Sequence, residues 1–97
     1  MGRMDWTTRD NPEQARYELV SGDQIGGFAA YEPGDDAVTF THTEVDSTYE
    51  GQGLGSRLVS AALDDVRSRG QQVVPRCRFV ADYIDKHDEY ADLVAPR

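Results

Sequence analysis

The sequence predicts a single α+β domain with a mixed sheet, built in the order β-β-β-α-β-α. Three observations support this fold class. Three short segments that contain β-branched or aromatic residues are separated by compact turns. An apolar stripe with helical spacing follows a glycine-rich turn, and a further apolar segment comes after that helix. The expected strands cover residues 16–20, 24–32, 37–45 and 71–80, and the expected helices begin at residues 54 and 81.

The first fifteen residues are polar and aperiodic, and they contain the turn-forming pair Asn11-Pro12. We therefore expect residues 1–15 to form a flexible N-terminal arm and residues 16–97 to form the folded domain. Trp6 is the only anchor in this arm. It is expected either to pack against the sheet or to belong to a poorly ordered start of the chain.

The first three strands are expected to form an antiparallel meander, because each is joined to the next by a short turn. The turns are Ser21-Gly22-Asp23 and Pro33-Gly34-Asp35-Asp36. The second strand contains Gly26 and Gly27, whose lack of side chains permits a close approach by another backbone or by a helix.

A helix after the third strand is indicated by one apolar face, and Gly70 supplies its end. The segment after it returns beside the third strand, which predicts a right-handed crossover and parallel pairing. Pro75 cannot donate a ladder hydrogen bond, so we expect this last strand to be interrupted or splayed there. The apolar face consists of Leu54, Leu58, Val59, Ala62, Leu63 and Val66.

The composition limits the possible functions. The chain has 97 residues and a net charge of -8, which argues against nucleic acid as a partner and mildly favours cationic partners such as amines. The alternative is that the acidity serves only to keep the protein soluble. Cys77 is the only cysteine, and no secretory or membrane-spanning segment is evident, so we expect a cytoplasmic protein without a membrane partner. No metal site is expected, and a monomer or a weak dimer is expected.

Glycines at positions 51, 53 and 55 lie between the third strand and the helix. They leave the backbone accessible to an anion, and the helix that follows aims free N–H groups at this turn. The spacing excludes the GxGxxG pattern, and no Gly-Lys-Ser/Thr of a P-loop follows. The turn is therefore either a phosphate site of another type or a strand-to-helix connection that binds nothing.

Two motifs resemble the GNAT acetyltransferase superfamily. Residues 50–55, EGQGLG, resemble its pyrophosphate motif Gln/Arg-x-x-Gly-x-Gly/Ala, with Glu50 in place of the usual first residue. Residues 77–94, from Cys77 through Tyr83, His87 and Tyr90, resemble the tail of the miniature GNAT-like proteins of the Yjdj type. Asp88 stands where those proteins have proline. The resemblance covers about residues 16–94 and implies a minimal GNAT-like acyl-CoA N-acyltransferase fold.

The resemblance implies acetyl-coenzyme A (acetyl-CoA) as the cofactor. Its pantetheine arm would lie between the third and fourth strands, against the backbone of Thr43, Glu44 and Val45. The Glu50 side chain would point outward. The pyrophosphate would meet the backbone of Gly51, Gln52, Gly53, Leu54, Gly55 and Ser56.

An amine acceptor must lose a proton before it attacks the thioester, so a base is needed. His42 and Glu44 share a strand face and are the candidates for this base. Alternation also places Phe40 on that face, so His42 is alternatively a hydrogen-bonded residue at the edge of the core. Cys77, expected on the fourth strand, is either an acyl-accepting nucleophile or a buried apolar residue.

Tyr83 is expected either to protonate the departing thiolate, as the resemblance implies, or to pack under its helix. His87 and Tyr90 are expected to form a structural clasp. The leading functional hypothesis is an N-acetyltransferase acting on a small-molecule or protein amine, with Cys77 as a possible intermediate carrier. The alternatives are a non-catalytic acyl-CoA-binding module or regulator, and a nucleotide- or phosphate-binding fold.

Overall fold

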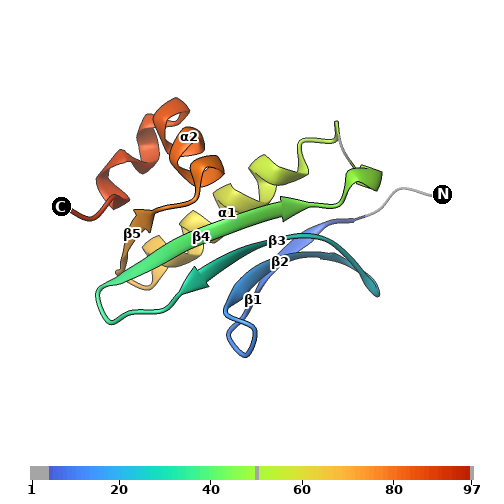
Figure 1. Ribbon diagram of the computed structural model, residues 1–97, viewed down its shortest axis with the longest axis horizontal. Coiled ribbons are helices and arrows are strands. Elements are labelled where there is room, and N and C mark those ends of the chain that lie inside the picture. The colour runs from blue at the N-terminus through green and yellow to red at the C-terminus, as the bar shows by residue number, and fades with distance from the viewer. Residues whose placement is uncertain (1–4, 50, 97) are drawn as a thin grey trace.

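The structure is a computed structural model that describes residues 5–49 and 51–96 (Figure 1). Its five strands form one sheet in the order β1-β2-β3-β4-β5. Strands β1 to β4 pair antiparallel and β5 pairs parallel to β4, so the expected meander and the parallel crossover are confirmed. The elements are β1 (Thr7–Asn11), β2 (Arg16–Ser21), β3 (Gln24–Glu32), β4 (Ala37–Val45), η1 (Ser47–Tyr49), α1 (Leu54–Ser68), β5 (Gln72–Pro75), α2 (Arg78–Lys86) and η2 (Asp88–Leu93).

The expectation of a flexible N-terminal arm is wrong for residues 7–11, which form the edge strand β1. Its register on β2 runs from Thr7 opposite Val20 to Asn11 opposite Arg16. The polar side chains of β1 gave no periodic signal because they are satisfied by partners far along the chain. Asp10, for example, accepts a hydrogen bond from the Tyr31 hydroxyl at 2.6 Å.

The core lies between the sheet and α1, which runs along one sheet face and contacts all five strands. Periodicity alone identified the face of α1 that packs there, since all six expected residues are at least 97% buried. Tyr17, Leu19 and Ala29 come from the sheet to meet this helix. No helix in the described part of the chain has the length and apolar character needed to cross a membrane.

The end of the chain differs from the expectation. We expected a strand over residues 71–80, but β5 ends at Pro75 and α2 begins at Arg78. Cys77 is therefore the N-cap of α2 rather than a strand residue. Pro75 offers no N–H to β4, and the Cys77 amide instead donates to the Phe40 carbonyl at 2.9 Å. The helical part of the C-terminal segment is broken at His87, between α2 and η2.

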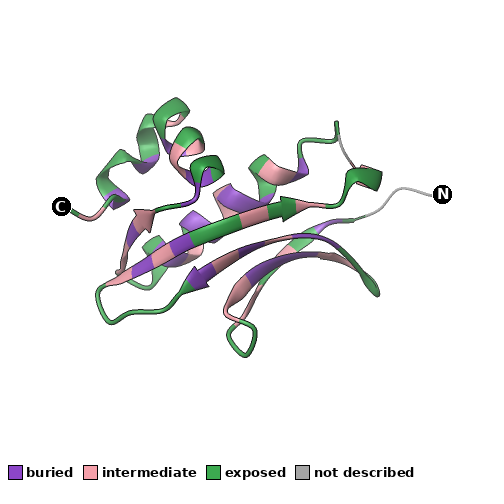
Figure 2. Cartoon of the chain, viewed as in Figure 1, coloured by how far each residue is buried: buried purple, intermediate pink, exposed green. Residues whose placement is uncertain are grey.

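A β-bulge interrupts the alternation of β4. Phe40 pairs with Tyr31 and His42 pairs with Ala30, so Thr41 has no partner in β3. The extra residue reverses the parity of the strand, and the expectation that His42 shares a face with Phe40 is wrong. Figure 2 shows this change along β4, where buried residues in the first half give way to exposed residues in the middle.

Candidate functional site

The second half of β4 has a free edge. Strand β5 pairs with β4 only from Ala37 to Phe40, and no described residue pairs with this edge from Thr41 onward. Backbone groups alternate in direction along a strand, and the Asp46 amide donates toward β3, to the Gly26 carbonyl, at 2.8 Å. The backbone groups of Thr43 and Val45 consequently face the free edge. The strand separation expected at Pro75 is confirmed.

Cys77 lies where β4 and β5 separate. Its side chain is buried, with 7% of the residue exposed, and its Sγ is 3.3 Å from the Thr43 hydroxyl. The Cys77 carbonyl accepts the Ala81 amide and so begins α2. The neighbours Arg76 and Arg78 are exposed. The thiol is thereby held beside the first part of the free edge, although no strand carries it.

His42 and Glu44 form an exposed imidazole-carboxylate pair on the outer face, by which we mean the sheet face turned away from α1. His42 Nε2 lies 2.7 Å from a Glu44 carboxylate oxygen, and their side chains are 59% and 62% exposed. A carboxylate accepts this bond, so Nε2 carries the hydrogen and Nδ1 of the neutral ring keeps a lone pair. Such a pair can accept a proton from an amine and stabilise the resulting imidazolium.

The glycine turn presents the N-terminus of α1. Gly51 and Gly53 have positive φ values of 83° and 71°, and Gly53 is the N-cap without a side-chain cap. The backbone amides of Leu54, Gly55 and Ser56 find no acceptor among the described residues. The Leu54 side chain is in the core, so only its backbone is available to a ligand. The expectation that Glu50 points outward lies outside the described residues.

Gly55 has a different role from the other two glycines. A Cβ at this position would lie 2.6 Å from the ring of Phe79, so the glycine permits α2 to pack closely on the first turn of α1. A hollow of about 210 Å³ lies beside this contact, lined by Ser56, Phe79, Tyr83 and His87 among others. Tyr83 thus lies near the glycine turn.

The expected clasp of His87 and Tyr90 is confirmed. The His87 ring stacks on Tyr83 with 3.9 Å between ring centroids, and its Nδ1 donates to the Tyr83 carbonyl at 2.7 Å. The Tyr90 hydroxyl donates to Asp64 of α1 at 2.8 Å. These contacts fix η2 and the end of α2 against α1. Tyr83 therefore packs against His87 and Tyr90, while its expected role as a proton donor stays a prediction.

Trp6 packs against the sheet, which is one of its two expected positions, and it joins the start of β3 to η1 and α1. It is 5% exposed, its ring edge lies over Gly26, and it meets Tyr49 edge to face at 4.9 Å. Its carbonyl accepts a hydrogen bond from Arg57 of α1 at 2.9 Å. The absence of a side chain at Gly26 leaves the space that the Trp6 ring fills.

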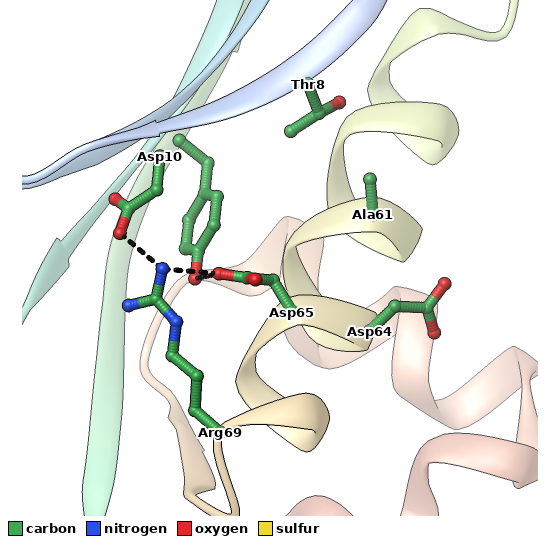
Figure 3. A pocket seen from close by; sticks show the side chains of 7 residues that line it. Thr8, Asp10, Ala61, Asp64, Asp65 and Arg69 are labelled. Atoms are coloured by element: carbon green, nitrogen blue, oxygen red, sulfur yellow. Dashed lines mark hydrogen bonds and ion pairs between the residues drawn. The ribbon is translucent and has the colours of Figure 1, made fainter.

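A second polar cavity, of about 530 Å³, lies between β1 and α1 (Figure 3). Arg69 bridges Asp10 and Asp65 at 2.9 and 2.8 Å, and the Tyr17 hydroxyl donates to Asp65 at 2.7 Å. Burial together with the bond to Asp65 raises the pKa of Tyr17. Asp64 points away from Arg69 in Figure 3. These groups are engaged with one another and fasten the edge strand to the helix.

The comparisons with known proteins agree with this geometry. Residues 16–93 match the family described as GCN5-related N-acetyl-transferase. None of the curated proteins compared with the chain matches it. The solution structure of a GCN5-like candidate N-acetyltransferase from Staphylococcus aureus has a TM-score of 0.69 at 19% identity, with 100% of this chain and 93% of that chain covered.

A crystal structure from Desulfovibrio desulfuricans, described as a candidate acetyltransferase of the GNAT family, has a TM-score of 0.58 at 14% identity. The alignment covers 90% of this chain and 83% of that one. These two likenesses support the fold, and the family match extends over most of the chain. The chain belongs to the GCN5-related N-acetyltransferase family and is an enzyme of the acetyltransferase class.

Proposed function

We propose that the protein transfers the acetyl group of acetyl-CoA to an amine at the free edge of β4. The observation that carries this proposal is the alignment of three features along one segment. The free edge of residues 41–45 leads to the glycine turn at the start of α1, and the imidazole-carboxylate pair stands beside it. We place the reaction in the cytoplasm, because the single cysteine suits a reducing compartment.

The cofactor would bind through backbone groups. The free amides at the start of α1, with the positive end of the helix dipole, suit a diphosphate. The backbone groups of Thr43 and Val45 at the free edge suit the amides of a pantetheine arm, which would pair with them as an added strand does. This arrangement would leave the thioester near Cys77, where β4 and β5 separate.

The residues then divide the proton transfers between them. The acceptor arrives as an ammonium ion and gives one proton to the pair of His42 and Glu44. Its nitrogen attacks the thioester carbonyl, the C–S bond breaks, and the new amide nitrogen loses its second proton. The coenzyme thiolate takes up one proton, for which Tyr83 is the donor we assign. One ammonium and one acetyl-CoA thus give one amide, one coenzyme A thiol and one free proton.

A two-step route through Cys77 is the second candidate, and the position of its thiol beside Thr43 favours it. The thiolate would take the acetyl group from coenzyme A and pass it to the amine, with the same overall balance. Cys77→Ser distinguishes the routes, because direct transfer survives this change whereas the two-step route does not. Intact mass of the protein after incubation with acetyl-CoA reports whether one acetyl group is retained.

The test of the proposed function is the rate of coenzyme A release with an amine present. Glu44→Gln and His42→Gln should each lower kcat by about 100-fold or more, while the dissociation constant for acetyl-CoA stays unchanged. Glu32→Gln, at another exposed glutamate at the end of β3, is the matched control and should retain full activity. Equal activity in all three variants would remove the pair from the mechanism. Cofactor binding without transfer to any amine would refute the proposed function.

A further inference from the structure

A hollow of about 300 Å³ lies on the outer face of the sheet, between the start of β3 and the end of β4. Its floor is formed by Ile25, Gly26, Gly27 and Phe28. Ile25 is 43% exposed and is one of only three large apolar residues that are exposed in the described part of the chain. The volume is at the small end of the range found for small-molecule sites.

The two ends of this hollow carry opposite charge. At the β2 end, the guanidinium of Arg16 lies 4.7 Å above the Phe28 ring and 2.7 Å from the buried Glu18. Glu18 is shared with Arg9 at 2.9 Å, so this end keeps one positive charge. At the β4 end, Glu44 and Asp46 present two exposed carboxylates. An ammonium group is repelled from the first end and attracted to the second, so the charges orient a cationic ligand.

The carboxylate end is also the end next to the proposed transfer site. Phe28 pairs across the sheet with Glu44, and Glu44 holds His42. An ammonium group placed against Glu44 would therefore lie beside the base and beside the strand whose other edge is free. The apolar floor extends from this point along β3, toward Ile25.

From these observations we propose that the hollow is the acceptor site, and that the acceptor is a small primary amine carrying an alkyl or aryl group. The inference rests on the proposed function. The apolar group lies on Ile25 and Phe28, and the amine faces Glu44 and Asp46. In the reaction the amine nitrogen gains the acetyl carbon and gives up two protons, one to the base and one on collapse of the intermediate, while the coenzyme sulfur gains one.

The test compares 2-phenylethylamine with ethanolamine as acceptors in the full-length protein. Ile25→Ser should lower kcat/KM for 2-phenylethylamine about tenfold and leave that for ethanolamine unchanged, because only the first amine uses the apolar floor. Asp46→Asn keeps the oxygen that accepts the Thr48 amide and should lower kcat/KM for both amines. Val94→Ser changes another exposed apolar residue, 36% exposed, and should have no effect.

Amide NMR shifts give a readout that does not depend on transfer. Titration of 2-phenylethylamine without acetyl-CoA should shift residues 25–28 and 44–46. If both amines are acetylated equally well and Ile25→Ser has no effect, the acceptor site is overturned while the proposed function stands. A lysine-containing peptide that outcompetes both amines would have the same meaning. Shifts in the hollow without acetylation of any amine would overturn the acceptor role and the proposed function together.

Discussion

Gly53 allows the proposed diphosphate site to be tested apart from the stability of the fold. Its φ is 71°, and a Cβ added there would meet no atom within 4 Å. Gly53→Ala should therefore destabilise the protein only through the left-handed backbone, by about 1 kcal/mol. Gly22, in the turn between β2 and β3, has a φ of 57° and equally open surroundings. Gly22→Ala should cost the same amount, at a position far from α1 in the sequence.

The two alanine variants should respond differently to coenzyme A. A ligand at 100 times its dissociation constant stabilises the folded state by about 2.7 kcal/mol. If the Cβ at position 53 weakens binding tenfold, the same concentration contributes only about 1.4 kcal/mol. The assay is urea unfolding of the wild type, Gly22→Ala and Gly53→Ala, each with and without coenzyme A. Equal stabilisation of both variants by the ligand would refute a diphosphate site at this turn.

The charge at the same position provides a second comparison. Asparagine and aspartate both tolerate the left-handed region and have nearly the same shape. Gly53→Asp places a negative charge beside the expected diphosphate. This charge should weaken the binding of coenzyme A by about 1 kcal/mol relative to Gly53→Asn, which is about fivefold in the dissociation constant. Equal affinities of these two variants would mean that no anion is bound near the start of α1.

Three further predictions concern the rest of the fold. Burial alone would raise the pKa of Glu18, but hydrogen bonds, chiefly from Arg16, hold this pKa below its usual 4.5. The ionised Glu18 therefore stabilises the fold above pH 4.5, and this contribution is lost as the pH falls through the lowered pKa. Glu18→Gln should flatten this acid-side loss and cost about 3 kcal/mol at pH 7 in urea unfolding. Burial and hydrogen bonds to aspartates raise the pKa values of Tyr31 and Tyr90 from 10.0 to about 12. As the pH rises, these tyrosines ionise in the unfolded chain before they ionise in the folded protein, so the free energy of unfolding should fall between about pH 10 and pH 12. The fall should be smaller in Tyr31→Phe and in Tyr90→Phe. Trp6→Ala should cost about 3 to 5 kcal/mol, whereas Trp6→Phe should cost less because it removes an indole N–H that has no partner among the described residues.

Periodicity and turn chemistry were sufficient to predict the central elements. The expected bounds 24–32 and 37–45 are those of β3 and β4, and the helix begins at Leu54 as expected. These segments are half-buried, so their apolar residues recur at the spacing of a strand or a helix. Strand β1 has no such signal, because it is an edge strand whose inward residue Asp10 is satisfied by Tyr31 and Arg69.

The position of Cys77 could not be predicted because the start of α2 has no sequence signal. The residue before a helix is usually Ser, Thr, Asp or Asn, whose side chain caps the first amides. Cys77 occupies this place without any side-chain cap. The hydrogen bond that fixes the position runs from its own amide to Phe40, a contact between residues far apart in the sequence. Tertiary contacts of this kind are invisible to local patterns.

The bulge at Thr41 explains how one strand serves both the core and the site. Before it, Val38 and Phe40 point into the core and β4 pairs with β5. After it, the parity is reversed, so His42 and Glu44 point to the outer face while Thr43 approaches Cys77. A regular strand would have buried His42 beside Phe40 and left Thr43 outside. The extra residue coincides with the point where β5 departs, so the same position changes the side-chain faces and opens the backbone edge. Sequence alternation cannot reveal an inserted residue of this kind, because Thr41 has the β propensity of its neighbours.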